Sequence, residues 1–145
     1  MADKKYYLTD IYDEWADEII KDKRPDILDA GISVGFVSST KEKKYGRIKN
    51  VLAECKKVSD LESLFCPHDF LIIVYELNCE GLTDEQMKIL LWHELEHIGI
   101  DPETGDFFVK PHDVEEFDDI NNAYGLYFKY RVLCYLRFVY FCRNG

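Results

Sequence analysis

Two histidines and a glutamate stand at a spacing that suits a metal ion. The run His93-Glu94-Leu95-Glu96-His97 is an H-E-x-x-H sequence. On a helix, residues 93 and 97 lie one turn apart on the same face, so both imidazoles can reach one ion. Zinc prefers neutral imidazole nitrogens at about 2.0–2.1 Å and keeps one tetrahedral position open in catalytic sites. The pattern therefore predicts a Zn²⁺ ion held by His93 and His97.

Glu94 follows the first histidine and is rotated from it by about 100° around the helix axis. We therefore expect Glu94 to hold the metal-bound water, to act as the general base and to pass the proton to the leaving amine. This chemistry is the hydrolysis of a peptide bond by a zinc metallopeptidase. Glu96 is expected to be an ordinary solvated carboxylate, with a role in binding a substrate amine or orienting a ligand as the alternative.

The site needs a third ligand, and His112 is our candidate. It lies fifteen residues after His97, beyond a loop that contains Gly105. The metzincin extension H-x-x-G-x-x-H is absent, because Ile100 stands at the position of its Gly and Glu103 at the position of its His. The alternative third ligands are carboxylates: Asp113, Glu115 and Glu116.

Hydrolysis also needs a donor to the developing oxyanion. Tyr124 and Tyr127, which follow His112, are the candidates, although the chain has ten tyrosines to choose from. His68 stands beside Cys66 and Asp69, where a second metal site is conceivable, but we expect a turn before a buried strand.

The motif lies within the helix that the sequence predicts most clearly. Thr83 and Gln86 form a capping box, in which each side chain bonds a main-chain N–H of the other residue. The predicted helix runs to about Ile98, with Gly99 as its C-terminal stop. An apolar stripe is expected to face the core on the side opposite the metal: Met87, Leu91, Leu95 and Ile98.

The remaining pattern alternates helices and strands. A first helix is expected from Thr9 or Asp10 to Lys23, with Ile11, Trp15, Ile19 and Ile20 at helical spacing. Residues 48–58 suit either a helix or, given the neighbouring strands, a hairpin. The other expected elements are a strand at 32–37, a buried central strand at 70–75, a short strand at 107–109 within the loop 101–111, and a helix at 113–124.

Composition and charge restrict the function. The 145 residues are 47% apolar and 32% charged, which is enough for a packed core, and the net charge is −10. This charge argues against nucleic-acid binding by the whole molecule, and the local basic stretch at 41–49 is expected to be a solvated turn. No apolar run is long enough to span a membrane, and residues 127–142, although apolar, are expected to pack on the domain. Without a secretion signal, the five cysteines are expected to be reduced thiols in a cytoplasmic protein.

Two segments resemble a known family. His93-Glu94-Leu95-Glu96-His97-Ile98-Gly99 and Lys110-Pro111-His112-Asp113-Val114-Glu115-Glu116-Phe117 are similar to the putative phage metallopeptidases, small zincin-like proteins of phages and prophages. The spacing of the third histidine also resembles that of SprT-like proteases. The resemblance implies His93, His97 and His112 as ligands, Glu94 as base, and work in the host cytoplasm. SprT-like enzymes act on DNA-bound proteins through extra DNA-binding parts, which we do not find, so that substrate class is not carried over.

The fold class that we predict is α+β. A minimal zincin-like domain over residues 1–145 would pack a small β-sheet on the motif helix, with further helices at both termini and residues 127–145 as an apolar extension. Its partner would be a protein or peptide substrate. Two alternatives stay open: a catalytically silent, zinc-stabilised protein that binds a host or regulatory partner, and a protease-like module that cleaves or displaces a repressor.

Overall fold

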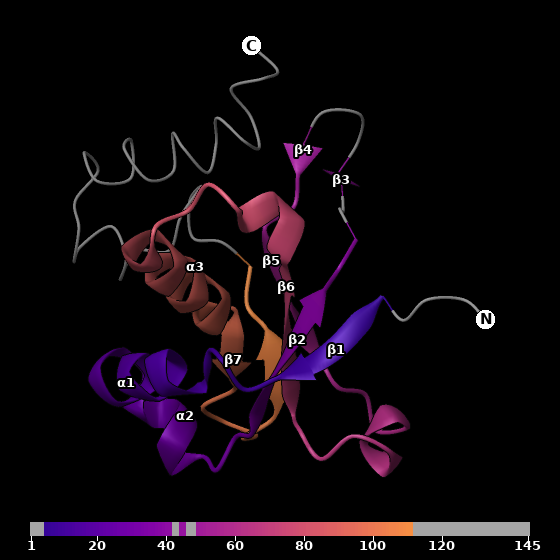
Figure 1. Cartoon of the computed structure of the whole chain (residues 1–145). Coiled ribbons are helices and arrows are strands. Elements are labelled where there is room, and N and C mark those ends of the chain that lie inside the picture. The colour runs from indigo at the N-terminus through magenta and orange to yellow at the C-terminus, as the bar shows by residue number, and fades with distance from the viewer. Residues whose placement is uncertain (1–4, 42–43, 46–48, 112–145) are drawn as a thin grey trace.

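The computed structural model describes residues 5–41, 44–45 and 49–111 of the chain (Figure 1). His112, Tyr124 and Tyr127 lie outside these residues, as do the predicted helix at 113–124 and the segment 127–145. The extent of the domain therefore stays a prediction.

A four-stranded mixed sheet forms the centre of the described chain, in the order β1-β2-β6-β5. Its strands are β1 (Tyr6–Thr9), β2 (Val34–Ser39), β6 (Phe70–Tyr75) and β5 (Ala53–Lys57). The central pair β2–β6 is parallel, with Val34 opposite Phe70, and both outer pairs are antiparallel. Two small ribbons accompany the sheet: β3 (Lys44–Tyr45) with β4 (Lys49–Asn50), and β7 (Ile98–Ile100) with β8 (Phe107–Val109).

Strand β6 is the buried central strand that its apolar run predicts. Phe70, Ile72 and Val74 are completely buried. The ambiguous segment 48–58 forms strands, with β5 pairing along β6 rather than coiling into a helix. The short strand expected at 107–109 is β8, with the predicted bounds.

The helices lie on one side of the sheet, at the left of Figure 1. They are α1 (Asp13–Lys23), α2 (Pro25–Asp29) and α3 (Asp84–Glu96), and two 3₁₀ turns, η1 (Glu62–Leu64) and η2 (Glu76–Cys79), follow β5 and β6. Apolar side chains of α1, α3 and the sheet share one hydrophobic core. The described chain is therefore a small α+β fold with its sheet packed against the motif helix, as predicted.

The N-terminal prediction was wrong in its starting point. The segment up to Thr9 is strand β1, and the helix begins only at Asp13. Ile11 therefore lies outside the helix and is 63% exposed, whereas its neighbour Tyr12 is buried against the ring of Phe36. Thr9, predicted as a helix start, is instead the last residue of β1 and pairs with Phe36 of β2.

The motif helix begins as predicted but ends earlier. Gln86 donates its main-chain N–H to Thr83 Oγ1 at 3.2 Å, and Thr83 donates its own to Gln86 Oε1 at 2.8 Å, which is the predicted capping box. The helix ends at Glu96, and Ile98 starts β7. Gly99 is thus a strand residue and not the helix stop. Glycine suits this position for another reason, because a Cβ here would lie 2.5 Å from the Phe108 ring of β8.

Candidate metal centre

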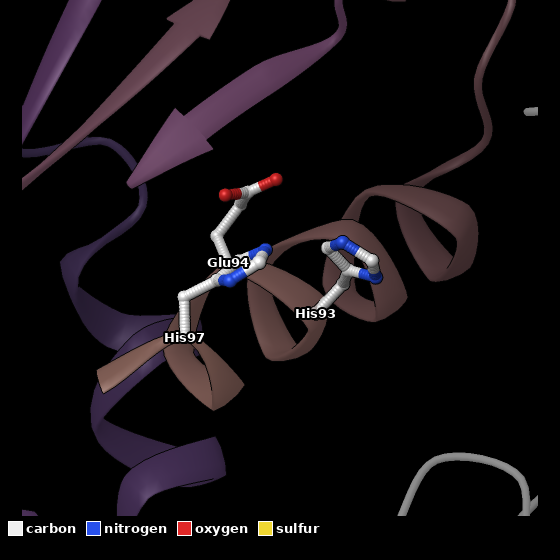
Figure 2. Close-up of side chains that lie close together, drawn as sticks. All are labelled: His93, Glu94 and His97. Atoms are coloured by element: carbon white, nitrogen blue, oxygen red, sulfur yellow. The ribbon is translucent and has the colours of Figure 1, made fainter. Parts of the chain in front are cut away.

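His93, Glu94 and His97 converge at the C-terminal end of α3. One ligand atom from each residue lies within 4.8 Å of those of the other two, which makes this the one cluster of three potential metal ligands among the described residues. The two imidazole rings are 5.2 Å apart between centroids and inclined at 73°. Figure 2 shows them side by side along the helix, with the Glu94 carboxylate projecting toward the sheet.

The helix is fixed in place because most of its circumference is buried. Leu91 and Leu95 are completely buried, and Met87 and Ile98 of the predicted apolar stripe are buried as well. Trp92, which is not part of that stripe, is buried as well. The buried surface of the helix is therefore wider than the predicted apolar stripe. A helix held on several sides gives His93 and His97 a defined separation, which a metal site requires.

The β7–β8 hairpin holds His97 through Lys110, the residue that follows β8. The Nδ1 atom of His97 donates to the main-chain oxygen of Lys110 at 2.7 Å, since a carbonyl can only accept. The main-chain N–H of Lys110 donates in return to the oxygen of His97. With the proton of a neutral ring on Nδ1, the lone pair is on Nε2, which is the tautomer that binds a metal through Nε2.

Glu94 is 4% exposed, and its charge acts on the thiols of Cys55 and Cys79. Burial first, and then the negative charge of Glu94, raise the pKa of the Cys55 thiol. Burial and the charges of Glu76 and Glu94 raise the pKa of Cys79 to about 12. Both thiols are therefore protonated at neutral pH.

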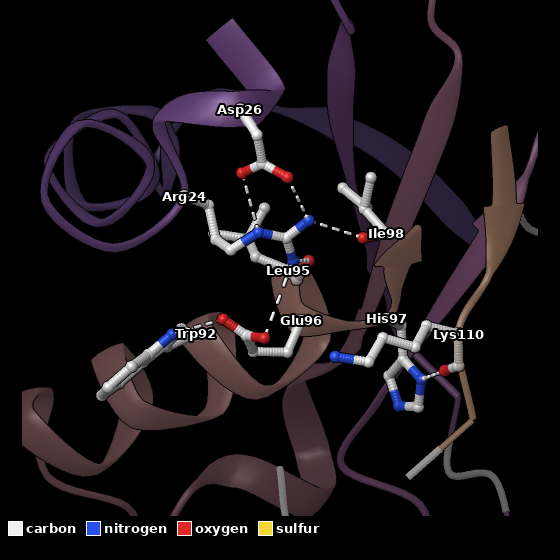
Figure 3. Close-up of polar contacts among 8 residues, drawn as sticks. All are labelled: Arg24, Asp26, Trp92, Leu95, Glu96, His97, Ile98 and Lys110. Atoms are coloured by element: carbon white, nitrogen blue, oxygen red, sulfur yellow. Dashed lines mark hydrogen bonds and ion pairs between the residues drawn. The ribbon is translucent and has the colours of Figure 1, made fainter. Parts of the chain in front are cut away.

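Glu96 corrects the sequence analysis, which expected a solvated carboxylate. Its exposed fraction is 1%. Trp92 Nε1 donates to Glu96 Oε1 at 2.9 Å, and the guanidinium of Arg24 lies 3.7 Å from Oε2 (Figure 3). A buried carboxylate needs such partners, because an unpaired charge is costly in the interior. Glu96 is thus a buried carboxylate that holds the motif helix in place through Trp92 and Arg24.

His68 is not part of the cluster. Its Nδ1 lies 2.7 Å from Ser33 Oγ, and its ring lies against Gly35, in the turn that was expected before β6. The predicted third ligand His112 and the predicted oxyanion donors Tyr124 and Tyr127 lie outside the described residues. None of the helices in the described part of the chain is long and apolar enough to cross a membrane.

Sequence reasoning missed two supports of the site. The Lys110 carbonyl carries no signal in the sequence, because any residue at this position offers one. Arg24 is separated from the motif by most of the described chain, and only the tertiary structure brings them together.

The cluster fits a metal ion: two imidazoles and a carboxylate are close together, and one imidazole is held in a tautomer suited to coordination. A small α+β fold that presents this cluster from a buried helix is therefore suited to hold a metal ion. A family model described as putative phage metallopeptidase matches residues 4–135, nearly the whole chain. The protein belongs to this family. No curated protein and no solved structure matches the chain.

Proposed function

We propose that the protein is a zinc-dependent metallopeptidase that hydrolyses peptide bonds, with His93 and His97 as ligands and Glu94 as general base. The observation that carries the proposal is the convergence of these three side chains within 4.8 Å on α3. Membership of the family supports the same conclusion. A zinc ion held by the imidazoles would supply a Lewis acid for the peptide carbonyl and for the attacking water.

Glu94 has the properties that a general base needs. It is adjacent to His93 in sequence, yet its carboxylate projects from a different side of the helix (Figure 2). Its burial limits contact with bulk water. Glu94 would therefore take a proton from the attacking water and pass it to the leaving amine in a site shielded from solvent. The thiols of Cys55 and Cys79 are protonated at neutral pH, so they do not compete with Glu94 as bases.

His112 is the proposed third ligand, and the position of Lys110 supports it. Lys110 is bound through both main-chain groups to His97, so the chain leaves the described part directly beside the cluster. Two residues of extended chain span at most about 7 Å. This short span supports His112 as the third ligand, and the carboxylates of Asp113, Glu115 and Glu116 stay the alternatives.

The rest of the proposal follows the sequence. Tyr124 or Tyr127 would donate to the oxyanion, and the substrate is a protein or peptide, as the family name implies. Residues 1–145 would form one domain that works in the cytoplasm of the host cell.

The decisive experiment compares the wild type with Glu94→Gln. Glutamine keeps the size of the side chain but cannot accept a proton as a base. We expect equal zinc content and a loss of cleavage of about 10²–10⁴-fold on a peptide library. Cys66→Ser, at a half-buried thiol with no assigned role, serves as the control.

Equal cleavage by Glu94→Gln and the wild type would overturn the mechanism. A wild type that binds zinc but cleaves nothing in a broad library would favour the silent zinc-stabilised binder.

A further inference from the structure

Arg24 occupies the junction between α1 and α2 and reaches into the end of the motif helix. Its Nη1 donates to the main-chain oxygen of Leu95 at 3.1 Å, and its Nη2 donates to that of Ile98 at 2.7 Å. These two carbonyls lie on either side of His97 in the chain. The Leu95 carbonyl lies in the last turn of α3, where carbonyls lack the usual partner one turn ahead, and the Ile98 carbonyl lies at the start of β7. Arg24 therefore joins the end of the helix to the start of the strand. Figure 3 shows the guanidinium between α2 and this turn.

Two carboxylates hold the guanidinium in this orientation. Asp26 accepts from Nε at 2.9 Å and from Nη2 at 3.0 Å, which is the bidentate geometry that fixes the plane of an arginine. Glu96 lies 3.7 Å from Nη1 and accepts from Trp92 on its other side. The side chain of Arg24 is 11% exposed and that of Glu96 only 2%. The guanidinium and Glu96 are therefore buried, whereas Asp26 holds the outer edge of the guanidinium at the surface, where its side chain is 51% exposed.

We propose that Arg24 is a positioning residue for the metal centre, which sets the turn at His97 so that this imidazole and His93 bind one ion. The proposal rests on the proposed metal site. His97 is held twice: Arg24 fixes the main chain on either side of it, and the Lys110 carbonyl fixes its ring. Arginine suits this role because its planar group has five N–H donors, whereas lysine has three on a single atom.

A simpler role for Arg24 would be the neutralisation of Glu96, and two substitutions separate the roles. Arg24→Met keeps an unbranched chain but removes the charge and all donors, which leaves Glu96 buried without its cation. This single variant is expected to unfold at a lower temperature. Adding Glu96→Gln removes the charge that Arg24 balanced, and the amide oxygen can still accept from Trp92. We expect the double variant to recover the unfolding temperature in the metal-free state.

The measurement is zinc affinity of the full chain by chelator competition, together with the visible spectrum of the cobalt-substituted protein, which reports ligand geometry. The positioning role predicts that the double variant still binds zinc about 10- to 100-fold more weakly and shows an altered cobalt spectrum. Arg24→Lys, which keeps the charge, is expected to behave in the same way. Lys56→Gln, which breaks the exposed 2.8 Å ion pair with Glu62, is the matched control.

Wild-type affinity and spectrum in both the double variant and Arg24→Lys would overturn the positioning role and leave the metal site intact. A wild type that binds no metal would instead overturn the proposed function, and this inference with it.

Discussion

The imidazole of His97 and the carbonyl of Lys110 are joined by a 2.7 Å hydrogen bond between the motif helix and the β7–β8 hairpin. Residues outside the ligand set often orient a metal-binding histidine in this way, through its second nitrogen. Here the acceptor is a main-chain atom, held by the pairing of Ile98 with Val109. The hairpin is therefore part of the site even though it contributes no ligand of its own.

Removal of either proposed ligand histidine should abolish tight metal binding. Loss of a residue that only hydrogen-bonds a metal ligand lowers metal affinity by about 10- to 100-fold. We expect His93→Ala and His97→Ala each to lower zinc affinity by more than this. His68→Ala is the control, because His68 lies apart from the cluster. Metal analysis after dialysis and chelator competition are the measurements. If His93→Ala and His97→Ala kept the zinc content of the wild type, the metal would bind elsewhere.

Substitution of the proposed third ligand, His112, tests a residue outside the described part of the chain. His112→Ala is expected to weaken zinc binding as strongly as His97→Ala. Acid should release the metal from the wild type, because a protonated imidazole cannot bind it. Titration with a competing chelator at several pH values measures both effects. If His112→Ala keeps the wild-type affinity, the carboxylates are to be tested one at a time: Asp113, Glu115 and Glu116.

Gly99→Ala should destabilise the fold through a clash across the hairpin. The new Cβ would lie 2.5 Å from the ring of Phe108, the residue directly opposite. Because that ring is partly exposed, it can move at a cost, which we expect to be about 1–3 kcal/mol in urea unfolding. In a Phe108→Ala background the same change should cost much less. An equal cost in both backgrounds would show that the contact is unimportant.

Asp26 should contribute to stability in a pH-dependent way. The hydrogen bonds from Arg24 lower its pKa below the ordinary value of 3.8, with burial opposing them. A lowered pKa means that the charged form stabilises the fold above pH 3.8 and that this contribution is lost as the pH falls through the lowered pKa. The difference in unfolding free energy between the wild type and Asp26→Asn should therefore shrink below pH 3.8. A difference that stays constant down to pH 2 would contradict the ion pair.

Local sequence patterns correctly predicted those features that depend only on residues close together in the chain. The capping box of Thr83 and Gln86 and the apolar run from Phe70 to Tyr75 are complete within a few residues, and both occur as predicted. The site residues of the motif converge for the same reason, since one helical turn separates His93 from His97.

The failures concern features that distant residues decide. Strand β1 is exposed on both faces at the sheet edge, so Tyr6, Tyr7 and Leu8 show no alternation of polar and apolar residues. The burial of Glu96 could not be predicted, because its cation Arg24 comes from another part of the chain. Ile98 is buried in β7 as it would be in a longer helix, so its hydrophobicity did not distinguish the two.

The reach of Arg24 also has a consequence for the order of folding. Its bonds to Leu95 and Ile98 close separations of 71 and 74 residues, and the parallel pairing of Val34 with Phe70 closes another long loop. Such long-range contacts are slow to form, because chain entropy is lost before they stabilise anything. We expect the β5–β6 hairpin to be protected first in pulsed hydrogen exchange and the turn at His97 among the last. A newly made chain would then acquire the geometry of the proposed metal site only at the end of folding, and a partly folded chain would hold a metal ion poorly.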